Sequence, residues 1–592
     1  MMKKINIKPI HFILLIIVLA VLYWIMLPPI HPQSPAFWRW LLIGFAAVWV
    51  LDSFKRSVSG EGGPKAGPIP HVKQGPNGPV FVFGPGAFKG FGKSKNPFKP
   101  KDTSDGNSSE PVGAGSSGGG KTGGFRISLL LPVFICLGVI AVFTLLSGSF
   151  FHAGLYSSRM VPAQGEAADL PTVEDVDHIS LVDTDSARIL GDRVIGSLSD
   201  VVSQFEVSND YTTLVHNDTI IKISPLEYGG FFKYWNNRQN GAPGYVIVDT
   251  QSFDASFVRL EKGIVYSPYG YFFKYLPRHI RLQFPTKILG NSRFEIDNDD
   301  HPYWVTPVYG RRFLFGGDFV NGAVITDPYT GASSFYENGN VPDWVDNLLT
   351  GDFACELYDS YGMLRNGFIN SVIGQKGCLK TTDDFGYLAK GNDLFIYTGV
   401  TSVNADESNL GFIMVNARTS ECTYVSCAGA EEYSAMAAAQ GMVQNYGYQA
   451  SFPSLVTVDG EPTYVMVLKD RGGLVKDYAA VNVRNYTLVS VEPSLNAALK
   501  SYRRSLGSSA ASNPNASAAE TATAEITLRQ VVFADTEGNT FAYLISEEGT
   551  IYKIAVSADE TVVALQAGDT LTVEYPAALE GEDVIPISGF SK

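Results

Sequence analysis

The sequence predicts an α+β membrane protein with three N-terminal transmembrane helices, a large outer region of about four helix-plus-antiparallel-sheet repeats, and a small C-terminal β-barrel. Three observations carry this prediction. Residues 127–147 form an uncharged apolar run of 21 residues, long enough for a helix to cross a bilayer core of about 30 Å. The net charge changes sign at this run. Beyond it, one helix followed by several strands recurs from residue 184 onward.

Two shorter apolar runs, residues 11–27 and 36–51, precede the third, and both approach the length that a transmembrane helix needs. A cleaved signal peptide is the alternative for the first run, because Lys3, Lys4 and Lys8 lie in front of it. No small-x-small cleavage site follows, however, and the second run begins at once. We therefore expect residues 1–52 to form an uncleaved transmembrane hairpin.

The charge distribution predicts the orientation. Residues 1–148 contain 15 Lys and Arg against 5 Asp and Glu, whereas residues 149–592 contain 30 against 54. Basic residues beside membrane spans stay on the cytoplasmic side. The sequence therefore predicts a multi-pass protein of the cell membrane with a cytoplasmic N-terminus and a large extracytoplasmic C-terminal region.

Residues 53–125 are rich in Gly, Pro, Ser and Lys, a composition that cannot bury enough apolar surface to fold. They predict a disordered, basic cytoplasmic linker. Its lysines between residues 89 and 101 either lie on anionic lipid head groups or belong to a solvated tether.

Residues 115–122 of this linker match the P-loop pattern G-x-x-x-x-G-K-[ST]. A P-loop needs a preceding strand and a following helix to shape its phosphate cradle. The residues in front of this match do not form a strand pattern, so we expect no nucleotide site and no other cofactor.

After an acidic stalk at residues 153–183, residues 184–504 contain the predicted repeats. Helical spacing of apolar residues marks 184–205, 267–277, 343–372 and 430–446, and Pro277 is expected to end or kink the second helix. The predicted strands are 211–215, 219–223, 244–249 and 256–260 in the first copy; 293–296, 303–309, 323–326 and 333–336 in the second; 394–397, 411–415 and 422–425 in the third; and 454–458, 463–468, 478–483 and 487–491 in the fourth.

One strand of each copy leads to Asp or Asn at a turn, at Asp249, Asp327, Asn416 and Asn482. These residue types tolerate turn dihedrals and hydrogen-bond their own backbone, which gives them a structural role. The strands in front of them are apolar on both faces. We therefore expect each strand to be covered on both sides, so that the repeats form one packed body.

The second copy contains Tyr303-Trp304-Val305 and then Val324-Ile325-Thr326-Asp327-Pro328-Tyr329-Thr330-Gly331. In these residues it resembles the PepSY domain, with the best match in 293–336 and a likeness extending over 184–492. The other copies lack the glycine and have Gln251-Ser252, Arg418-Thr419 and Tyr486-Thr487 at the turn. The resemblance implies extracytoplasmic modules that bind or inhibit peptidases or regulate cell-wall processes. The region also resembles uncharacterised membrane-anchored proteins of Gram-positive-type bacteria.

Residues 505–523 form a Ser/Ala-rich linker in front of the C-terminal region 524–592. This region contains five short strand patterns, 524–533, 541–545, 551–556, 570–573 and 584–587, which predict a small SH3- or OB-like barrel. OB folds often bind nucleic acid, but an acidic region is a poor partner for a polyanion. We expect no nucleic-acid partner.

The acidic cluster of Asp297, Asp299, Asp300 and His301, with Glu295 nearby, is the candidate metal site, because hard cations take several convergent oxygen ligands. The calcium-loop spacing fails here, since Asp300 and His301 follow Asp299 directly. A polar hairpin turn is the interpretation we favour.

The outer region contains Cys355, Cys378, Cys422 and Cys427, which allow three complete disulfide pairings. Their spacing is not that of a zinc site. We find no nucleophile elbow, zinc-protease helix or paired-cysteine redox motif after Ser147, so no catalytic residue is predicted.

The predicted function is therefore non-catalytic. We expect a membrane-anchored envelope protein, with lipid around its spans, whose outer region binds a protein, a peptide or a cell-wall component. The resemblance adds regulation of a peptidase or wall enzyme. One alternative is an enzyme with an unrecognised site in a cleft between repeats. The other is a scaffold of a multiprotein envelope or cell-shape assembly.

Overall fold

A computed structural model describes residues 9–58, 72–75, 78–81, 123–172, 180–217, 219–382, 384–403, 408–512, 521–536, 539–556, 559–576, 584–587 and 589–592. The chain divides into two compact units. The first consists of Met1–Pro28 and Ser34–Phe143, and the second of Pro29–Gln33 and Thr144–Lys592. The P-loop match at 115–122 and most of the predicted linker 53–125 lie outside the described residues.

The first unit contains three apolar helices, α1 (Pro9–Met26), α2 (Pro35–Val58) and α3 (Gly123–Leu146), and a short hairpin of β1 (Val72–Gly75) and β2 (Gly78–Phe81). Trp40 Nε1 of α2 donates to the backbone oxygen of Leu19 in α1 at 3.1 Å. Gly44 permits this packing, because a Cβ there would lie 2.4 Å from the Leu19 side chain.

One helix near the N-terminus, Pro35–Phe54, is long and apolar enough by itself to cross a membrane. Leu130–Leu146 meets the same criteria only when it is counted as one broken span with Ser149–Ser157, and Phe12–Met26 is shorter. Among the described residues, length and composition therefore support one clear spanning helix.

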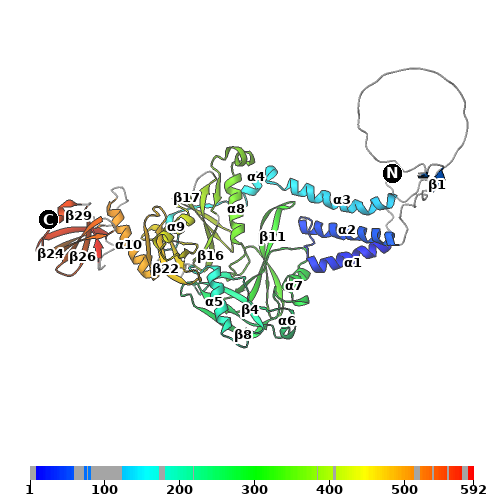
Figure 1. The fold of residues 1–592 in the computed structure, drawn as a ribbon, viewed down its shortest axis with the longest axis horizontal. Coiled ribbons are helices and arrows are strands. Elements are labelled where there is room, and N and C mark those ends of the chain that lie inside the picture. Colours follow the sequence, from blue (N-terminus) through cyan, green and yellow to red (C-terminus); the bar gives the residue numbers. More distant parts are fainter. Residues whose placement is uncertain are drawn as a thin grey trace, which may run out of the picture. The chain divides into compact units, whose positions relative to one another are not determined.

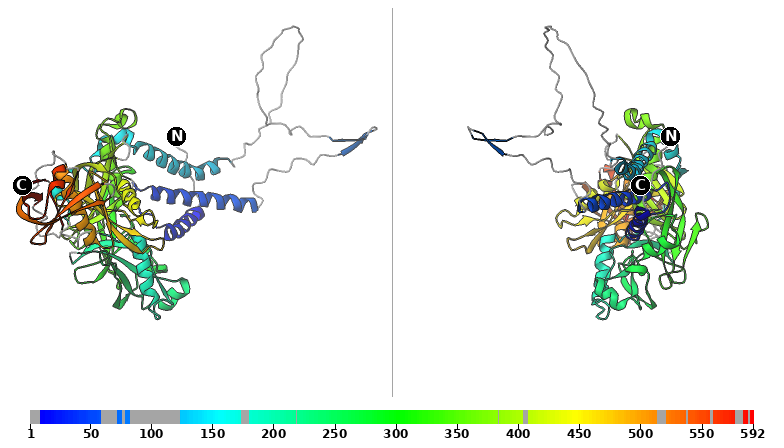
Figure 2. Two further views of the ribbon diagram at one scale, coloured as in Figure 1. Left: turned by 60° about the vertical axis from the view of Figure 1, so that its left-hand side comes forward. Right: turned by 90° about the vertical axis from the view of Figure 1, so that its right-hand side faces the viewer.

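Before its C-terminal sheet, the described part of the second unit contains four sheets with helices packed against them (Figures 1 and 2). They are antiparallel except at the edge of the third sheet, where β3 (Ala163–Gly165) joins in parallel. The strands of the first two sheets are β4 (Phe205–Val207), β5 (Thr212–His216), β6 (Thr219–Tyr228), β7 (Ala242–Asp249) and β8 (Ala255–Ile264), and then β9 (Ile288–Leu289), β10 (Arg293–Ile296), β11 (Pro302–Phe313), β12 (Gly316–Thr326) and β13 (Ser333–Glu337). The third sheet comprises β14 (Leu379–Thr381), β15 (Gly386–Lys390), β16 (Asp393–Ser402), β17 (Ser408–Asn416) and β18 (Cys422–Ala430). The fourth comprises β19 (Gln449–Ala450), β20 (Ser454–Val458), β21 (Glu461–Lys469), β22 (Val475–Asn482) and β23 (Val489–Glu492).

The four sheets have the same strand order. In each sheet, two short strands pair with the same edge of a long strand. The other edge of that strand pairs with a second long strand, and a further strand pairs with the free edge of the second. The short strands also divide the long one in the same way. For example, β5 pairs with the start of β6 and β4 pairs with its end. In the third sheet, β15 pairs with the start of β16 and β14 pairs with its end.

Both faces of the central strands are buried, as the alternation of apolar residues predicts. In β17, Ile413 and Val415 lie in a core that includes Leu357, whereas Phe412 and Met414 lie in another core with residues of the fourth sheet. A strand that contributes to two cores joins the sheets on either side of it. The prediction of one packed body is therefore supported at this strand.

The turn residues hydrogen-bond their own backbone, as predicted. Asp249 Oδ1 accepts from the N–H groups of Gln251 and Ser252, Asp327 Oδ1 from those of Tyr329 and Thr330, Asn416 Oδ1 from those of Arg418 and Thr419, and Asn482 Oδ1 from that of Asn485, all within 2.7–2.9 Å. These side chains shape turns, which accounts for their residue type.

The first three of these turns also share a left-handed residue four positions after the Asp or Asn. Gly331 has φ 77° there, Phe253 has φ 60° and Ser420 has φ 65°. Glycine adopts this left-handed conformation without strain, whereas a residue with a Cβ is strained in it by about 1 kcal/mol. The glycine of the Asp-x-x-Thr-Gly sequence thus occupies a position that all three turns require.

The helices differ more from the predictions than the strands do. They are α5 (Thr184–Gly196), α6 (Phe231–Asn237), α7 (Leu276–Gln283), α8 (Gly351–Leu364), α9 (Glu432–Met442) and α10 (Leu495–Ser512). The predicted helix 267–277 is wrong, because Pro277 lies in the first turn of α7 instead of ending a helix. Proline lacks the N–H that the first turn leaves unpaired, so it suits this position. The predicted helix 343–372 begins only after Thr350, whose side chain accepts from the Phe353 N–H.

The predicted acidic stalk at 153–183 is partly built into the second unit. It contains the end of α4 (Ser149–Ser157) and β3 (Ala163–Gly165), which pairs with β18. Met160, Leu170 and Leu181 are buried. Residues 173–179 lie outside the described part of the chain.

The C-terminal strands form a half-barrel sheet in the order β28-β26-β25-β24-β27-β29. They are β24 (Thr521–Thr536), β25 (Asn539–Ser546), β26 (Ile551–Ala555), β27 (Thr570–Pro576), β28 (Val584–Pro586) and β29 (Gly589–Ser591). The long β24 pairs with β27 along its first half and with β25 along its second. The predicted linker 505–523 begins inside α10 and ends inside β24, while closure into an SH3- or OB-like barrel stays a prediction.

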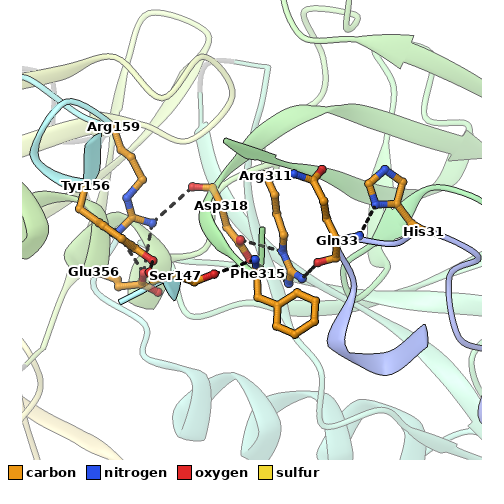
Figure 3. Close-up of polar contacts among 9 residues, drawn as sticks. All are labelled: His31, Gln33, Ser147, Tyr156, Arg159, Arg311, Phe315, Asp318 and Glu356. Carbon is orange, nitrogen blue, oxygen red and sulfur yellow. Dashed lines mark hydrogen bonds and ion pairs between the residues drawn. The ribbon is translucent and has the colours of Figure 1, made fainter. Parts of the chain in front are cut away.

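One face of the second unit contacts both segments that adjoin the apolar helices in sequence (Figure 3). The Arg311 guanidinium donates to the backbone oxygen of Gln33, and the Ser147 hydroxyl accepts from the Phe315 N–H at 2.9 Å. Gly316 makes room here, because a Cβ would lie 2.1 Å from the Tyr156 hydroxyl. We call the loop Pro29–Gln33, Ser147 and the hairpin tip 311–316 the helix-proximal face.

Candidate functional site

A polar cavity of about 480 Å³ opens where the first three sheets meet. Its described lining comes from five separate segments, with Val215, Asn217, Asn298, Asp343, Trp344, Asn392, Asp393 and Arg418. Most of these positions follow strand ends or lie in turns, so the packing of the sheets brings them together. The volume lies in the range of small-molecule sites, but the polar lining differs from the mainly apolar lining of most such sites.

The wall formed by the third sheet is held by hydrogen bonds. Asp393 Oδ2 accepts from Asn416 Nδ2 at 2.8 Å, and its other oxygen pairs with the Arg418 guanidinium. The Asn416 turn therefore fixes the position of Arg418. Arg418 Nε is buried and has no hydrogen-bond partner among the described residues, so any contact of Arg418 with a ligand would use the exposed part of its guanidinium.

Trp344 supplies the aromatic part of the lining. Its ring stacks on Tyr303 with centroids 5.0 Å apart and an interplanar angle of 28°, and the Tyr303 ring in turn contacts His301. Stacking fixes the plane of the indole, so this side of the cavity is preformed.

The segment 343–349 joins the first and second sheets behind the lining by hydrogen bonds. Val215 N–H, from the first sheet, donates to Asp346 Oδ2 at 2.7 Å. The carboxylate of Glu295, from the second sheet, accepts from the N–H groups of Asp346 at 2.8 Å and Asn347 at 3.1 Å. The side-chain amide of Asn347 donates through Nδ2 to the backbone oxygen of Thr213 at 2.8 Å. We call Glu295, Asp346 and Asn347 the buried junction.

Burial shifts the ionisation of the junction. It raises the pKa of Glu295 to about 7, although the two backbone donors oppose the shift. The pKa of Asp346 is also raised, by burial first and then by the neighbouring Glu295 carboxylate. Two carboxyl groups in a dry site resist carrying charge together. Both side chains are almost fully buried, so neither is open to a substrate in the cavity.

Lys222 lies in the same part of the first sheet. Its Nζ donates to Thr213 Oγ1 at 2.8 Å and lies 5.9 Å from the centre of the Tyr387 ring, in the third sheet. Burial lowers its pKa to about 8. Lys222 thus contributes to the contact between sheets and does not line the cavity.

The candidate metal residues are spread over a turn beside the cavity. Asp297 Oδ1 accepts from the N–H groups of Asp299 and His301, at 3.0 and 2.9 Å. Asp300 pairs with His216 at 2.9 Å and His301 with Asp327 at 3.5 Å, so the two face different partners. Within the described ranges, no group of three or more His, Cys, Asp or Glu side chains is arranged to hold a metal ion.

The sequence missed most of the cavity. Glu295 stood out only as part of an acidic cluster, and its partner Asp346 lay inside a predicted helix. The predicted candidate Asp299 is exposed, and only the neighbouring Asn298 lines the cavity. Runs of Asn and Asp at several turns are the one signal that could have pointed here.

The cysteines are free thiols: Cys136, Cys355, Cys378, Cys422 and Cys427. None of the three complete pairings considered for the outer region is formed. Burial raises the pKa values of Cys355 and Cys422 to about 12, which keeps both as unreactive thiols.

Comparison with models of known protein families gives no match, and comparison with curated protein sequences gives none either.

Proposed function

We propose that this chain is a membrane-anchored, non-catalytic binding protein of the cell envelope, whose outer region binds a polar group of a protein, a peptide or a cell-wall component. The observation that carries the proposal is the cavity between the sheets. It combines a fixed indole, Trp344, with amide, carboxylate and guanidinium groups from Asn392, Asp343 and Arg418. Such a set can stack on a ligand and hydrogen-bond to hydroxyl or amide groups.

The distribution of titratable groups favours binding over catalysis. General acid–base catalysis needs a group with a pKa near neutrality within reach of the substrate. Glu295 and Glu432 have pKa values of about 7, but both side chains are buried and accept backbone N–H groups. The groups open to the cavity include Asp393 and Arg418, which pair with each other.

The proposed anchor is multi-pass, with three spans and a cytoplasmic N-terminus. Its support is the helix-proximal face. Gln33 precedes α2 in the chain and Ser147 follows α3, and both contact the β11–β12 hairpin of the second unit. If α1, α2 and α3 all cross the bilayer, the loop between α1 and α2 emerges on the same side as the end of α3. Gln33 and Ser147 must lie on the same side of the bilayer to contact one hairpin, and three spans give this arrangement.

We further propose that the four helix-plus-sheet groups are copies of one repeat of PepSY-like type. Their common strand order supports this proposal, as do the shared turns at Asp249, Asp327 and Asn416. Repeats that share faces bury cores that none of them could bury alone. The resemblance adds regulation of a peptidase or wall enzyme as the role of such binding.

Binding to the full chain in lipid nanodiscs tests the function. Soluble cell-wall glycan fragments and short peptides are titrated, and tryptophan fluorescence and calorimetry report binding. Asn392→Ala and Asp343→Ala change exposed lining residues, so the fold should be kept and affinity should fall about tenfold for each lost polar contact. Asn291→Ala, at an exposed position outside the lining, is the matched control.

Two results would overturn the proposal. Equal affinity of the wild-type and cavity variants for every ligand that binds would remove the cavity from the function. Chemical conversion of a ligand by the wild-type chain that Asp343→Ala abolishes would make the protein an enzyme.

A further inference from the structure

Six aromatic side chains gather on the surface of the second unit, around α6 and the short 3-10 helix Phe272–Lys274. They are Phe231, Phe232, Trp235, Tyr271, Phe272 and Phe273, and we call them the aromatic patch. All six are exposed, with Phe232 at 82 % and Phe273 at 66 % of their full accessible surface. Contiguous exposed aromatic surface of this kind marks a contact with another molecule or a membrane.

The patch is a built surface. Tyr234, on the inner side of α6, is buried and donates its hydroxyl hydrogen to the Tyr271 oxygen at 3.1 Å. Phe231 meets Tyr271 edge to face, with ring centroids 5.2 Å apart. These contacts hold α6 against the turn, so the outward rings of Phe232 and Phe273 are presented by a fixed support.

A chain of contacts connects the patch to the helix-proximal face. The Ile30 N–H, in the loop before α2, donates to the Pro285 oxygen at 2.7 Å. Pro285 follows α7, and Arg278 of α7 donates to the Phe272 oxygen at 2.7 Å. The helix Phe272–Lys274 directly precedes α7 in the chain. The patch is therefore linked within the second unit to the loop Pro29–Gln33.

The segments around the patch carry a net positive charge, whereas residues 149–592 as a whole carry a net negative charge. Residues 228–241 and 263–292 contain six Lys and Arg and no Asp or Glu, whereas residues 149–592 as a whole carry 30 basic against 54 acidic residues. Arg238 lies 4.2 Å from the centre of the Trp235 ring, so a cation accompanies the aromatic surface directly.

We propose that the aromatic patch inserts into the head-group layer of the membrane that carries the apolar helices, and so holds the second unit against the bilayer. Aromatic rings prefer the boundary between head groups and acyl chains, and neighbouring Lys and Arg side chains are attracted to anionic lipids. The local excess of positive charge and the tether at Ile30 favour a lipid surface over a protein partner. The inference rests on the membrane anchor, but it does not depend on what the cavity binds.

The test places an environment-sensitive fluorophore at single introduced cysteines of the full chain, in nanodiscs that hold one chain each. Phe232→Cys reports the patch. Tyr446→Cys, at a position exposed to 71 % in the turn after α9, is the matched control. Leu137→Cys in α3, measured with lipids that carry a spin label deep in the acyl chain, reports whether that helix lies in lipid. The labelling of the unchanged chain is subtracted.

With lipids that carry a spin label near the head group, we expect at least twofold stronger quenching at position 232 than at 446. We also expect a blue-shifted emission that grows when anionic lipid replaces zwitterionic lipid. Quenching at 137 with no more quenching at 232 than at 446 would overturn the docking and leave the anchor intact. A blue shift at position 232 without quenching would show that a protein surface covers the patch, and this result would also overturn the membrane docking. A lack of quenching at position 137 by the label in the acyl chain would instead overturn the membrane anchor.

Discussion

The carboxylate of Glu295 accepts the backbone N–H of Asp346 at 2.8 Å, and both side chains are almost fully buried. Glu295 belongs to the second sheet, whereas Asp346 also accepts the N–H of Val215 from the first. This pair is thus the polar centre of the contact behind the cavity, and its ionisation state should affect the stability of the assembled sheets.

The pKa of Glu295, raised to about 7 by burial, predicts an unusual pH dependence. A carboxyl group with a higher pKa in the folded state holds its proton more tightly there, so the folded state loses stability as the pH rises from about 4.5 to about 7. We expect the thermal unfolding midpoint of the full chain to fall over this window. The fall should be smaller in Glu295→Gln.

The matched control for this prediction is Glu337→Gln, which changes an exposed glutamate of the same sheet. It should leave the pH profile unchanged. If Glu295→Gln had the same profile as the wild-type chain, Glu295 would not be the group responsible.

Val248→Asp tests the packed body of sheets. Val248 is fully buried in the core shared by the first and second sheets, so an unpaired charge there should cost about 3 kcal/mol or more. Limited proteolysis should show that protection is lost in neighbouring sheets together. Ser256→Asp, at an exposed position of β8, should retain protection. Cleavage of Val248→Asp confined to residues 184–264 would indicate independent domains.

The shared left-handed turn position predicts opposite effects for two substitutions. Ser420 has φ 65° and its hydroxyl has no partner among the described residues, so Ser420→Gly should stabilise the fold by about 1 kcal/mol. Gly331 has φ 77°, and a Cβ there would lie 2.6 Å from the Tyr266 ring. Gly331→Ala should therefore destabilise the fold by more than about 1 kcal/mol. Chemical denaturation measures both, and effects of the same sign would contradict the equivalence of the two turns.

Strands were easier to predict than helices for a physical reason. The predicted strand 411–415 lies within β17, because its residues are apolar on both faces and a buried strand needs little else. The helix α6 was missed, since Phe231-Phe232-Lys233-Tyr234-Trp235 has no strong helix former besides lysine. Its helical form depends on the contact between Tyr234 and Tyr271, which the sequence does not reveal.

The cavity could not be predicted from local patterns. Asn217, Trp344 and Arg418 are far apart in the chain and meet only because the sheets pack together. The turn role of Asn416 was predictable from its residue type, but its use in positioning Asp393 and Arg418 depends on the neighbouring strand. Local chemistry is visible in the sequence, whereas the partner of each group is decided by the fold.

The side of the membrane on which three positions lie tests the central claim of an anchored outer region. Ile30→Cys, a reporter inserted after Lys101 and a reporter after Lys592 are compared in intact cells with membrane-impermeant reagents. Because Ile30 contacts Pro285 of the second unit, we predict that Ile30 and Lys592 are accessible from outside, whereas Lys101 is protected until the cells are opened. Finding Ile30 and Lys592 on opposite sides, or Lys101 and Lys592 on the same side, would contradict the account.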